Sequence, residues 1–286
     1  MVFGDLELFS LSDGSFALDG GAMFGVIPRV FWQKTNPPDE RNRISLALRP
    51  LLVKTPDALV LIDTGIGDKQ DGKFRDVYRV DHSARLLDSL GSAGFSPEDV
   101  THVVNTHLHF DHCGGNTVVS SEQAAGSSRS KIVTTFPNAK YVVQETEWQA
   151  ATSPDKRSRA SYLPENFLPI QEQGQLVLVA GDREIVPGVR VLHTSGHTVG
   201  HQAVVVESQG KKAMYWGDLI PTASHVNVPY IMGYDTMPLI TMDRKEALLK
   251  AVLGEQRLMF FEHDPVIASG YLGEEQGRYV VKSAND

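Results

Sequence analysis

Seven consecutive residues, Thr106 to His112, carry three imidazoles and one carboxylate. Imidazole nitrogens and carboxylate oxygens are the protein ligands of divalent transition metals. His107 and His109 are separated by one residue and can face a single ion. Asp111 and His112 follow too closely to complete the coordination of that same ion. The spacing therefore predicts two metal ions in one site.

Three later segments place further candidate ligands directly after apolar runs that are typical of buried strands. His197 lies in a glycine-rich loop after the run 189–192, Asp218 follows the run 213–216, and His263 follows an apolar run at 258–261. Loops at strand ends can present side chains from distant parts of the chain at one rim of a rigid scaffold. We therefore expect the ligands at 107–112 to share one site with Asp218, His263 and histidines of the glycine-rich loop, which contains His193, His197 and His201.

The strand-like runs fall into two groups, with helical patterns between and after them. The first group covers residues 3–11, 45–54, 58–62 and 101–105, and the second covers 140–143, 176–179, 189–192, 203–207 and 213–216. Helical patterns cover 83–93 and start again at Asp243, and Ser96 before Pro97 is typical of a helix N-cap. This order predicts an α+β fold with two packed sheets and helices outside them, a four-layer αββα sandwich.

We expect residues 1–286 to form a single domain, because this length suits one large core and the sequence contains no internal repeat. Two stretches, near 20–43 and 150–172, mix aromatic residues with proline and polar residues and are typical of insertions. Such loops cover a core, form a subunit contact or line a substrate pocket. The sequence leaves these three roles open.

The composition excludes several classes of function. A net charge of −8 offers no basic surface for nucleic acid or an anionic membrane, so neither is an expected partner. Cys113 is the single cysteine, which rules out an intramolecular disulfide framework. The N-terminus lacks the basic and apolar segments of a signal peptide, and no window has the roughly 18 apolar residues of a membrane helix. We therefore expect a cytoplasmic protein.

Taken together, these motifs resemble those of the metallo-β-lactamase-fold hydrolases. The HxHxDH signature of that family is present at 107–112, and the matching motifs extend over about residues 46–270. The resemblance implies that Asp218 bridges two ions and that Asp63 is a buried carboxylate that orients the ligand loops. It divides the other ligands between the ions: His107, His109 and His197 for one, and Asp111, His112 and His263 for the other.

Two divalent ions bridged by a carboxylate imply metal-assisted hydrolysis. Zinc lowers the pKa of bound water from about 15.7 to about 7, so a hydroxide between the ions is the expected nucleophile. Asp111 or Asp218 is the candidate to carry a proton to the leaving group. The ligand set suits zinc but also accepts manganese, iron or cobalt.

Within this family, the stretches 21–28, 105–116 and 217–222 resemble the quorum-quenching N-acyl-homoserine lactonases of the YtnP-like group. His109 disfavours the flavodiiron oxidoreductases, which carry glutamate there, and Asp218 disfavours the β-lactamases. The resemblance implies a lactone or related ester as substrate and a homodimer as the assembly. The alternatives are a phosphotriesterase of the methyl-parathion type, an aryl esterase and, outside enzymes, a metal-bound sensing protein.

One departure from the lactonase pattern concerns the residues that bind the substrate. Pro221 stands where the best-known lactonases have a tyrosine that holds the substrate carbonyl. His225, Tyr230 and Tyr234 are the candidate replacements. The aromatic stretch near the N-terminus is the candidate groove for an acyl chain, and its candidate lining residues are Met23, Phe24, Ile27 and Trp32.

Several polar residues beside these motifs have two interpretations. His201 is expected to hydrogen-bond within its own loop and to support the site. His193 either lines the pocket or is satisfied by the backbone at the end of its strand. Cys113 either binds metal or is a small buried residue of a tight turn. Glu262 and Asp264 flank a candidate ligand and either orient it or are solvated.

Overall fold

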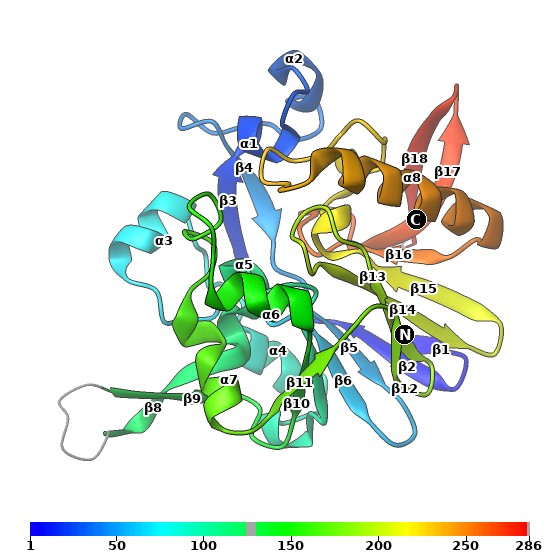
Figure 1. Ribbon diagram of the computed structural model, residues 1–286. Coiled ribbons are helices and arrows are strands. Elements are labelled where there is room, and N and C mark those ends of the chain that lie inside the picture. The colour runs from blue at the N-terminus through cyan, green and yellow to red at the C-terminus, as the bar shows by residue number, and fades with distance from the viewer. Residues whose placement is uncertain (124–129, 285–286) are drawn as a thin grey trace.

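The computed structural model describes residues 1–123 and 130–284, which form two packed sheets with helices on their outer sides (Figure 1). The first sheet has the strand order β1-β2-β5-β6-β7-β10-β11. Its strands are β1 (Val2–Phe3), β2 (Leu6–Ser10), β5 (Leu51–Lys54), β6 (Leu59–Ile62), β7 (His102–Val104), β10 (Lys140–Gln144) and β11 (Leu176–Val179).

The second sheet runs in sequence order from β12 to β18. Its strands are β12 (Arg183–Val186), β13 (Val189–His193), β14 (Gln202–Ser208), β15 (Lys211–Tyr215), β16 (Leu258–Phe260), β17 (Ser269–Glu275) and β18 (Arg278–Ser283). Neighbouring strands are antiparallel except β15 and β16, which are parallel and are connected through the long helix α8 (Pro238–Glu255). A long crossover of this kind is what a parallel pair requires.

Two strands lie in a different sheet from the one that their order in the sequence predicts. Strand β10 pairs in parallel with β7, where Tyr141 lies opposite Val103, and also with β11, where Tyr141 lies opposite Leu176. The expectation that 140–143 and 176–179 begin the second sheet was therefore wrong. Grouping by order fails here because the chain leaves the first sheet after β7 and re-enters the same sheet at β10. The crossover between these strands contains four of the seven candidate ligands.

Two short antiparallel ribbons extend from the sheets. One pairs β3 (Ser15–Asp19) with β4 (Arg43–Ala47), and the other pairs β8 (Thr117–Gln123) with β9 (Ser130–Thr134). The single strand predicted for 45–54 is thus divided between β4 and β5. Pro50 lies at the division, and a proline cannot donate a hydrogen bond to a sheet.

The helices differ from the predicted ones mainly at their first residues. Helix α4 begins at Leu86 rather than at residue 83, and α8 begins at Pro238 rather than at Asp243 because proline is favoured in the first turn. Ser96 caps a short 3₁₀ turn, as predicted. Besides α8, the helices are α1 (Gly20–Phe24), α2 (Arg29–Trp32), α3 (Gly72–Tyr78), α4 (Leu86–Ser92), α5 (Phe110–Cys113), α6 (Glu145–Thr152) and α7 (Leu168–Glu172). The 3₁₀ turns are η1 (Pro97–Asp99), η2 (Gly114–Asn116), η3 (Pro164–Asn166), η4 (Gly217–Leu219) and η5 (Ala223–His225).

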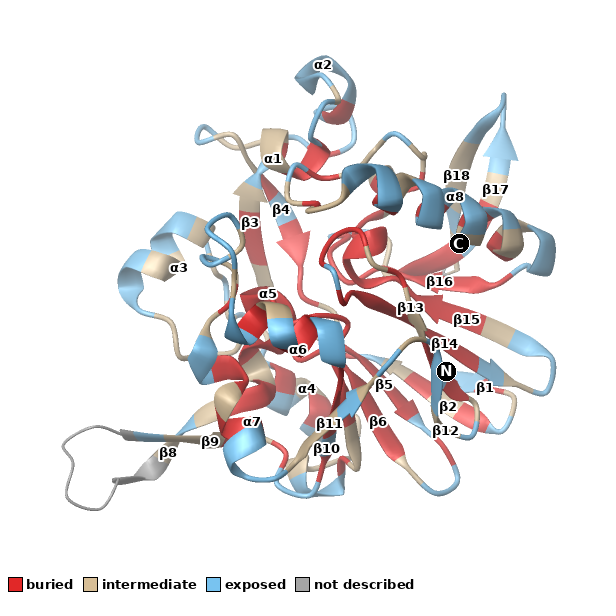
Figure 2. Cartoon of the chain, in the orientation of Figure 1, coloured by how far each residue is buried: buried red, intermediate tan, exposed pale blue. Residues whose placement is uncertain are grey.

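Three apolar layers hold the sheets and helices together (Figure 2). Between the sheets, Val60 and Val104 of the first sheet pack in one cluster with Val204 of the second. The outer face of the first sheet packs against α4 and α6, and the outer face of the second packs against α8. Because both faces of each sheet are covered, central strands such as β6 are apolar at every position.

Among the described residues, no helix combines the length and the apolar character that crossing a bilayer requires.

Candidate metal centre

The seven candidate ligands lie in the segments that follow strands, as their sequence positions predict. His107 and His109 lie between β7 and α5, and Asp111 and His112 lie within α5. The other three follow strands of the second sheet: His197 after β13, Asp218 in η4 after β15, and His263 after β16. The site therefore joins the two sheets at one rim.

One group of ligand atoms comes from His107, His109, His197 and Asp218. The Nδ1 atom of His109 lies 3.0 Å from His107 Nε2 and 3.1 Å from His197 Nε2. The Oδ2 atom of Asp218 lies 3.2 Å from His197 Nε2 and 3.9 Å from His107 Nε2. All four side chains are buried, and each points one donor atom at the same small volume.

A second group comes from Asp111, His112 and His263. The Nε2 atoms of the two histidines are 3.1 Å apart, and Asp111 Oδ2 lies 3.6 Å from His263 Nε2. The Oδ1 atom of Asp218 lies 3.4 Å from His112 Nε2 and 3.3 Å from His263 Nε2. The two oxygens of Asp218 thus face different groups, Oδ2 the first and Oδ1 the second.

Two of the histidines are oriented by acceptors on the side away from the site. His197 Nδ1 lies 2.9 Å from Asp235 Oδ1, and His263 Nδ1 donates to the carbonyl of Ala47 at 2.9 Å. An acceptor at Nδ1 places the proton there and leaves the lone pair of Nε2 free for a metal. Asp235, in the segment after η5, was not among the residues expected from the sequence.

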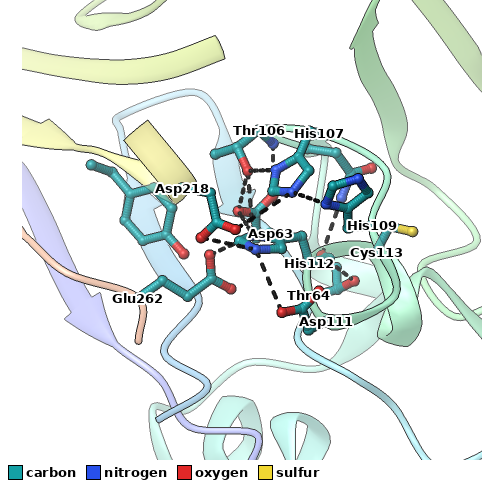
Figure 3. A network of polar contacts seen from close by, with 12 residues as sticks. Asp63, Thr64, Thr106, His107, His109, Asp111, His112, Cys113, Asp218 and Glu262 are labelled. Atoms are coloured by element: carbon teal, nitrogen blue, oxygen red, sulfur yellow. Dashed lines mark hydrogen bonds and ion pairs between the residues drawn. The ribbon is translucent and has the colours of Figure 1, made fainter. Parts of the chain in front are cut away.

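His112 and His107 are oriented by a network around Asp63 (Figure 3). Asp63 accepts hydrogen bonds from the amide and the hydroxyl of Thr106, both at 2.7 Å, and its Oδ2 lies 3.0 Å from His112 Nδ1. Glu262 Oε2 lies 2.7 Å from the same nitrogen, and Thr106 Oγ1 lies 3.1 Å from His107 Nδ1. Glu262 is therefore buried against a candidate ligand rather than solvated.

The charges at these positions suit divalent cations. Burial and the neighbouring imidazoles hold the pKa of His107 and His109 well below the usual value, so both rings are neutral, as a metal ligand must be. Although burial opposes it, the charges of Glu262 and Asp218 hold the pKa of His112 well above its usual value. The carboxylates around His112 therefore favour positive charge inside the site.

A buried carboxylate oxygen also indicates that the site binds cations. Asp218 Oδ1 is buried and makes no hydrogen bond of good geometry with any residue in 1–123 or 130–284. A buried polar atom without a donor is costly unless a cation or water satisfies it. The donor set, its burial and this orphaned oxygen together fit two divalent cations with Asp218 between them.

A pocket of about 210 Å³ opens above the two groups. Its floor includes His109, Asp111, Asp218 and His263, and its walls include the apolar or aromatic side chains of Leu18, Met23, Tyr78, Phe110 and Tyr234. A polar floor below largely apolar walls is typical of a site for a small organic ligand.

The aromatic residues near the N-terminus lie mostly behind this pocket. Met23 lines it, whereas Phe24 and Trp32 are buried and stacked on each other with ring centroids 5.5 Å apart. Ile27 and Tyr230 pack partly buried against the same cluster. The stretch 20–43 thus covers a core and contributes one residue, Met23, to the pocket wall.

The three candidate replacements for the family tyrosine lie in different places. His225 is buried, and its two ring nitrogens are engaged by Thr222 Oγ1 at 2.7 Å and the carbonyl of Met23 at 2.8 Å. Tyr230 is not among the residues that line the pocket, and Tyr234 is. Tyr234 is therefore the one of the three that faces the candidate ligands.

The stretch 150–172 contributes four residues to the lining of the pocket: Arg157, Ser158, Ala160 and Ser161. Arg157 donates hydrogen bonds to the carbonyls of Gly233 and Asp235, the latter at 3.0 Å. These bonds bracket Tyr234, so Arg157 holds in place the segment that carries both Tyr234 and the Asp235 partner of His197.

The remaining polar residues beside the motifs have structural partners. His201 accepts a hydrogen bond from the Asp218 amide at 3.1 Å and contacts Thr194 Oγ1 at 2.7 Å. His193 Nε2 lies 3.0 Å from a backbone carbonyl, and the thiol of Cys113 donates to the carbonyl of Leu108 at 3.3 Å. Asp264 accepts hydrogen bonds from three backbone amides, of which the shortest is 2.7 Å.

Glu147 is a further buried carboxylate at the site that has no motif in the sequence. It lies in the first turn of α6, directly after β10, and has no side-chain exposure. Like the candidate ligands, Glu147 follows an apolar strand. However, a single glutamate in the first turn of a helix is common, so this position alone does not indicate a function. Only its tertiary contacts connect it with the site.

Comparison with known proteins identifies the family. Residues 50–263 match the model of the metallo-beta-lactamase superfamily. The chain belongs to this superfamily. The match to the metallo-beta-lactamase superfamily, with the two packed sheets, confirms the predicted fold class and the predicted resemblance.

Three proteins that are similar to this chain are described as hydrolases or lactonases. A structure described as a probable metal-dependent hydrolase from Staphylococcus aureus has a TM-score of 0.88 and 32% identity, over 99% of both chains. A structure of an N-acyl homoserine lactone hydrolase with N-hexanoyl-L-homoserine at its catalytic metal centre has a TM-score of 0.69 and 25% identity, over 93% of this chain and 95% of that one. An N-acyl homoserine lactonase from Bacillus sp is 29% identical over 229 residues, which are 74% of this chain and 79% of the relative.

Proposed function

We propose that this protein is a dinuclear metal-dependent hydrolase that opens the lactone ring of N-acyl-homoserine lactones or closely related lactones and esters. The proposal rests on one observation above all: Asp218 points one oxygen at each of two buried ligand groups, at the floor of an apolar pocket. The similarity to the Bacillus relative, whose name is N-acyl homoserine lactonase, supports the choice of substrate.

The ligand groups would hold one ion each, His107, His109 and His197 for the first and Asp111, His112 and His263 for the second. When bound, two divalent ions lower the pKa of water and polarise an ester carbonyl. Asp218 bridges the groups and holds them at a constant separation. Asp111 and Asp218 line the pocket, and we assign to one of them the proton that the leaving ring oxygen takes up. Among the metals that this ligand set accepts, we propose zinc, which imidazole nitrogens and carboxylate oxygens commonly bind in catalytic sites.

The alternative activity is that of a phosphotriesterase, because two bridged metal ions can also polarise a phosphoryl oxygen. The relative from Bacillus sp carries a lactonase name, which favours the lactone. A kinetic panel separates the two: acyl-homoserine lactones, aryl esters and aryl phosphotriesters are assayed on protein whose metal content has been measured. We expect the highest kcat/KM for a lactone. Inactivity on every lactone, with turnover of another class, contradicts the substrate assignment.

Tyr234 is expected to donate a hydrogen bond to the substrate carbonyl. Its side chain lines the pocket beside Asp218 and His263, and no hydrogen bond to its hydroxyl occurs within the described residues. Tyr234→Phe removes that donor alone. The carbonyl oxygen gains negative charge in the transition state of ester hydrolysis, and a hydrogen bond to a charged group contributes about 1.5–3 kcal/mol, or roughly 10–100-fold. We expect kcat/KM for a hexanoyl lactone to fall by that factor.

Tyr230→Phe is the matched control, because Tyr230 lies outside the pocket wall and packs edge-on against Phe24. Its kcat/KM should stay within about twofold of the wild type, as is usual for changes remote from reacting groups. Equal losses in the two variants, or no loss in Tyr234→Phe, would show that the carbonyl is held by another group.

We also propose a homodimer and a cytoplasmic location. The dimer is supported by exposed apolar side chains in the first insertion, where Val26, Val30 and Phe31 are 86%, 59% and 55% exposed. Sedimentation at micromolar concentration is expected to give twice the mass of the chain. A monomer at all concentrations measured contradicts the proposed assembly.

A further inference from the structure

The buried carboxylate of Glu147 accepts hydrogen bonds from three separate segments of the chain. Its Oε1 accepts from the backbone amide of Leu108 at 3.0 Å and from the hydroxyl of Tyr162 at 3.0 Å. Its Oε2 accepts from the hydroxyl of Thr198 at 2.5 Å. All the donors are themselves buried. Glu147 thus ties together three segments that are 39, 15 and 51 residues away from it in the sequence.

Each donor is adjacent to a candidate ligand of the first group. Leu108 lies between His107 and His109 in the sequence, and Thr198 directly follows His197. The ring of Tyr162 packs against the His109 ring, with centroids 5.0 Å apart. One carboxylate therefore holds all three histidines of the first group, although none of them contacts it through a ring nitrogen.

The loop with His197 approaches the first turn of α6 closely. A Cβ atom added to Gly200 would lie 2.2 Å from the backbone nitrogen of Glu147, a distance that no side chain tolerates. Helix α6 follows β10 of the first sheet, whereas this loop follows β13 of the second sheet. Glu147 thus lies where the two sheets bring the halves of the first ligand group together, among the buried residues of α6.

Holding the sheets together does not by itself require this carboxylate. Other contacts cross the same boundary: Gln202 donates from its side chain to the Asn105 carbonyl at 2.8 Å and accepts from the Gln144 amide at 2.9 Å. A buried charge also stabilises a fold less than an apolar side chain of similar volume does. The three directed hydrogen bonds add a defined geometry. They fix the positions of the three donor segments, which apolar packing alone leaves adjustable.

We propose that Glu147 is a positioning residue that sets the distance between the His107–His109 pair and His197, and thereby the metal affinity of the first ligand group. The proposal rests on the two-metal site proposed above. The second group has its own partners, Asp63 and Glu262, so Glu147 is expected to act on one ion and leave the other nearly unaffected.

Metal affinity of each site, measured without substrate, tests this inference. Metal-free wild-type protein and variants are titrated with zinc against a chromophoric chelator, and cobalt spectra report the geometry of the ligands. Glu147→Ala is expected to weaken one of the two sites by roughly 10–100-fold, the usual effect of removing a partner of metal ligands. Glu147→Gln should recover part of this loss, since its amide oxygen still accepts from Leu108 and Tyr162.

Two further variants provide the controls. Glu145→Gln changes an exposed glutamate in the same turn and should leave both affinities within about twofold, as surface changes usually do. Glu262→Gln alters the partner of His112 and should weaken the other site. In the double variant Glu147→Ala/Glu262→Gln, losses at two different sites should combine additively in free energy.

Unchanged affinities in a folded Glu147→Ala variant, with only a lower melting temperature, would overturn the inference. If that variant does not fold, Thr198→Val and Tyr162→Phe each remove one donor, and unchanged affinity in both overturns it as well. Because zinc binding is measured without substrate, a wrong choice of lactone as substrate does not affect the result. Wild-type protein that binds fewer than two ions contradicts the two-metal function instead.

Discussion

Asp218→Ala is expected to lower kcat/KM for an acyl-homoserine lactone by roughly 10³-fold or more, because metal ions stabilise the transition state by several kcal/mol. The variant removes the carboxylate whose two oxygens face both ligand groups at 3.2–3.4 Å. Without it, the buried imidazoles of the two groups have no shared anion between them. We therefore also expect the zinc content to fall below two ions per chain.

Activity, metal content and thermal melting are measured together on this variant. Asp218→Asn keeps the shape and removes the charge, and it should lose nearly as much activity because the bridging role requires a carboxylate. Asp243→Ala is the control, since Asp243 is exposed on α8 and distant in sequence from all candidate ligands. Wild-type turnover in Asp218→Ala would show that the bridge between the ions is another residue.

Removing the metals is expected to abolish hydrolysis and to lower the melting temperature by roughly 15–30 °C. Ions at about 1,000 times their Kd stabilise the folded state by about 4 kcal/mol each, and a domain of this size loses about 2–4 °C per kcal/mol. The structural reason is the number of buried donors: the two ligand groups contain seven buried side chains. Without cations, the carboxylates and the closely spaced imidazoles remain buried with only one another as partners.

The measurement compares protein treated with a strong chelator, then dialysed, with the same protein after zinc is added back. We expect two equivalents of zinc to restore both activity and melting temperature, and one equivalent to restore neither fully. A chelated sample that melts at the original temperature, or keeps its turnover after metal analysis finds no ions, contradicts a metal-dependent mechanism.

The strands and the candidate ligands were predictable from local patterns. Runs such as 58–62 and 203–206 are continuous apolar segments, because strands covered on both faces need apolar residues at every position. Each candidate ligand follows such a run, so its place at a strand end can be read without knowing which strands are neighbours. The pattern HxHxDH places four potential metal ligands within six residues, and such a high density of ligands has little use other than metal binding.

The sheet membership of β10 and β11 was not predictable in this way. Their sequences are as apolar as those of the second sheet, and pairing with β7 is decided by register between distant segments, such as Tyr141 with Val103. The choice among the aromatic residues also required the tertiary structure. Phe24 and Tyr234 are both plausible pocket residues by type, and packing buries Phe24 in a core while it places Tyr234 in the pocket wall.

The sequence by itself determined the chemistry of this protein: the ligand types, their spacing and their positions after strands, because these depend only on residues close together in the chain. The tertiary structure alone decided how the ligands combine. The two oxygens of Asp218 face different groups, Asp235 orients His197, and Glu147 joins the loops of both sheets. Each of these contacts links residues far apart in the sequence, and their distances are set only when the two sheets pack together.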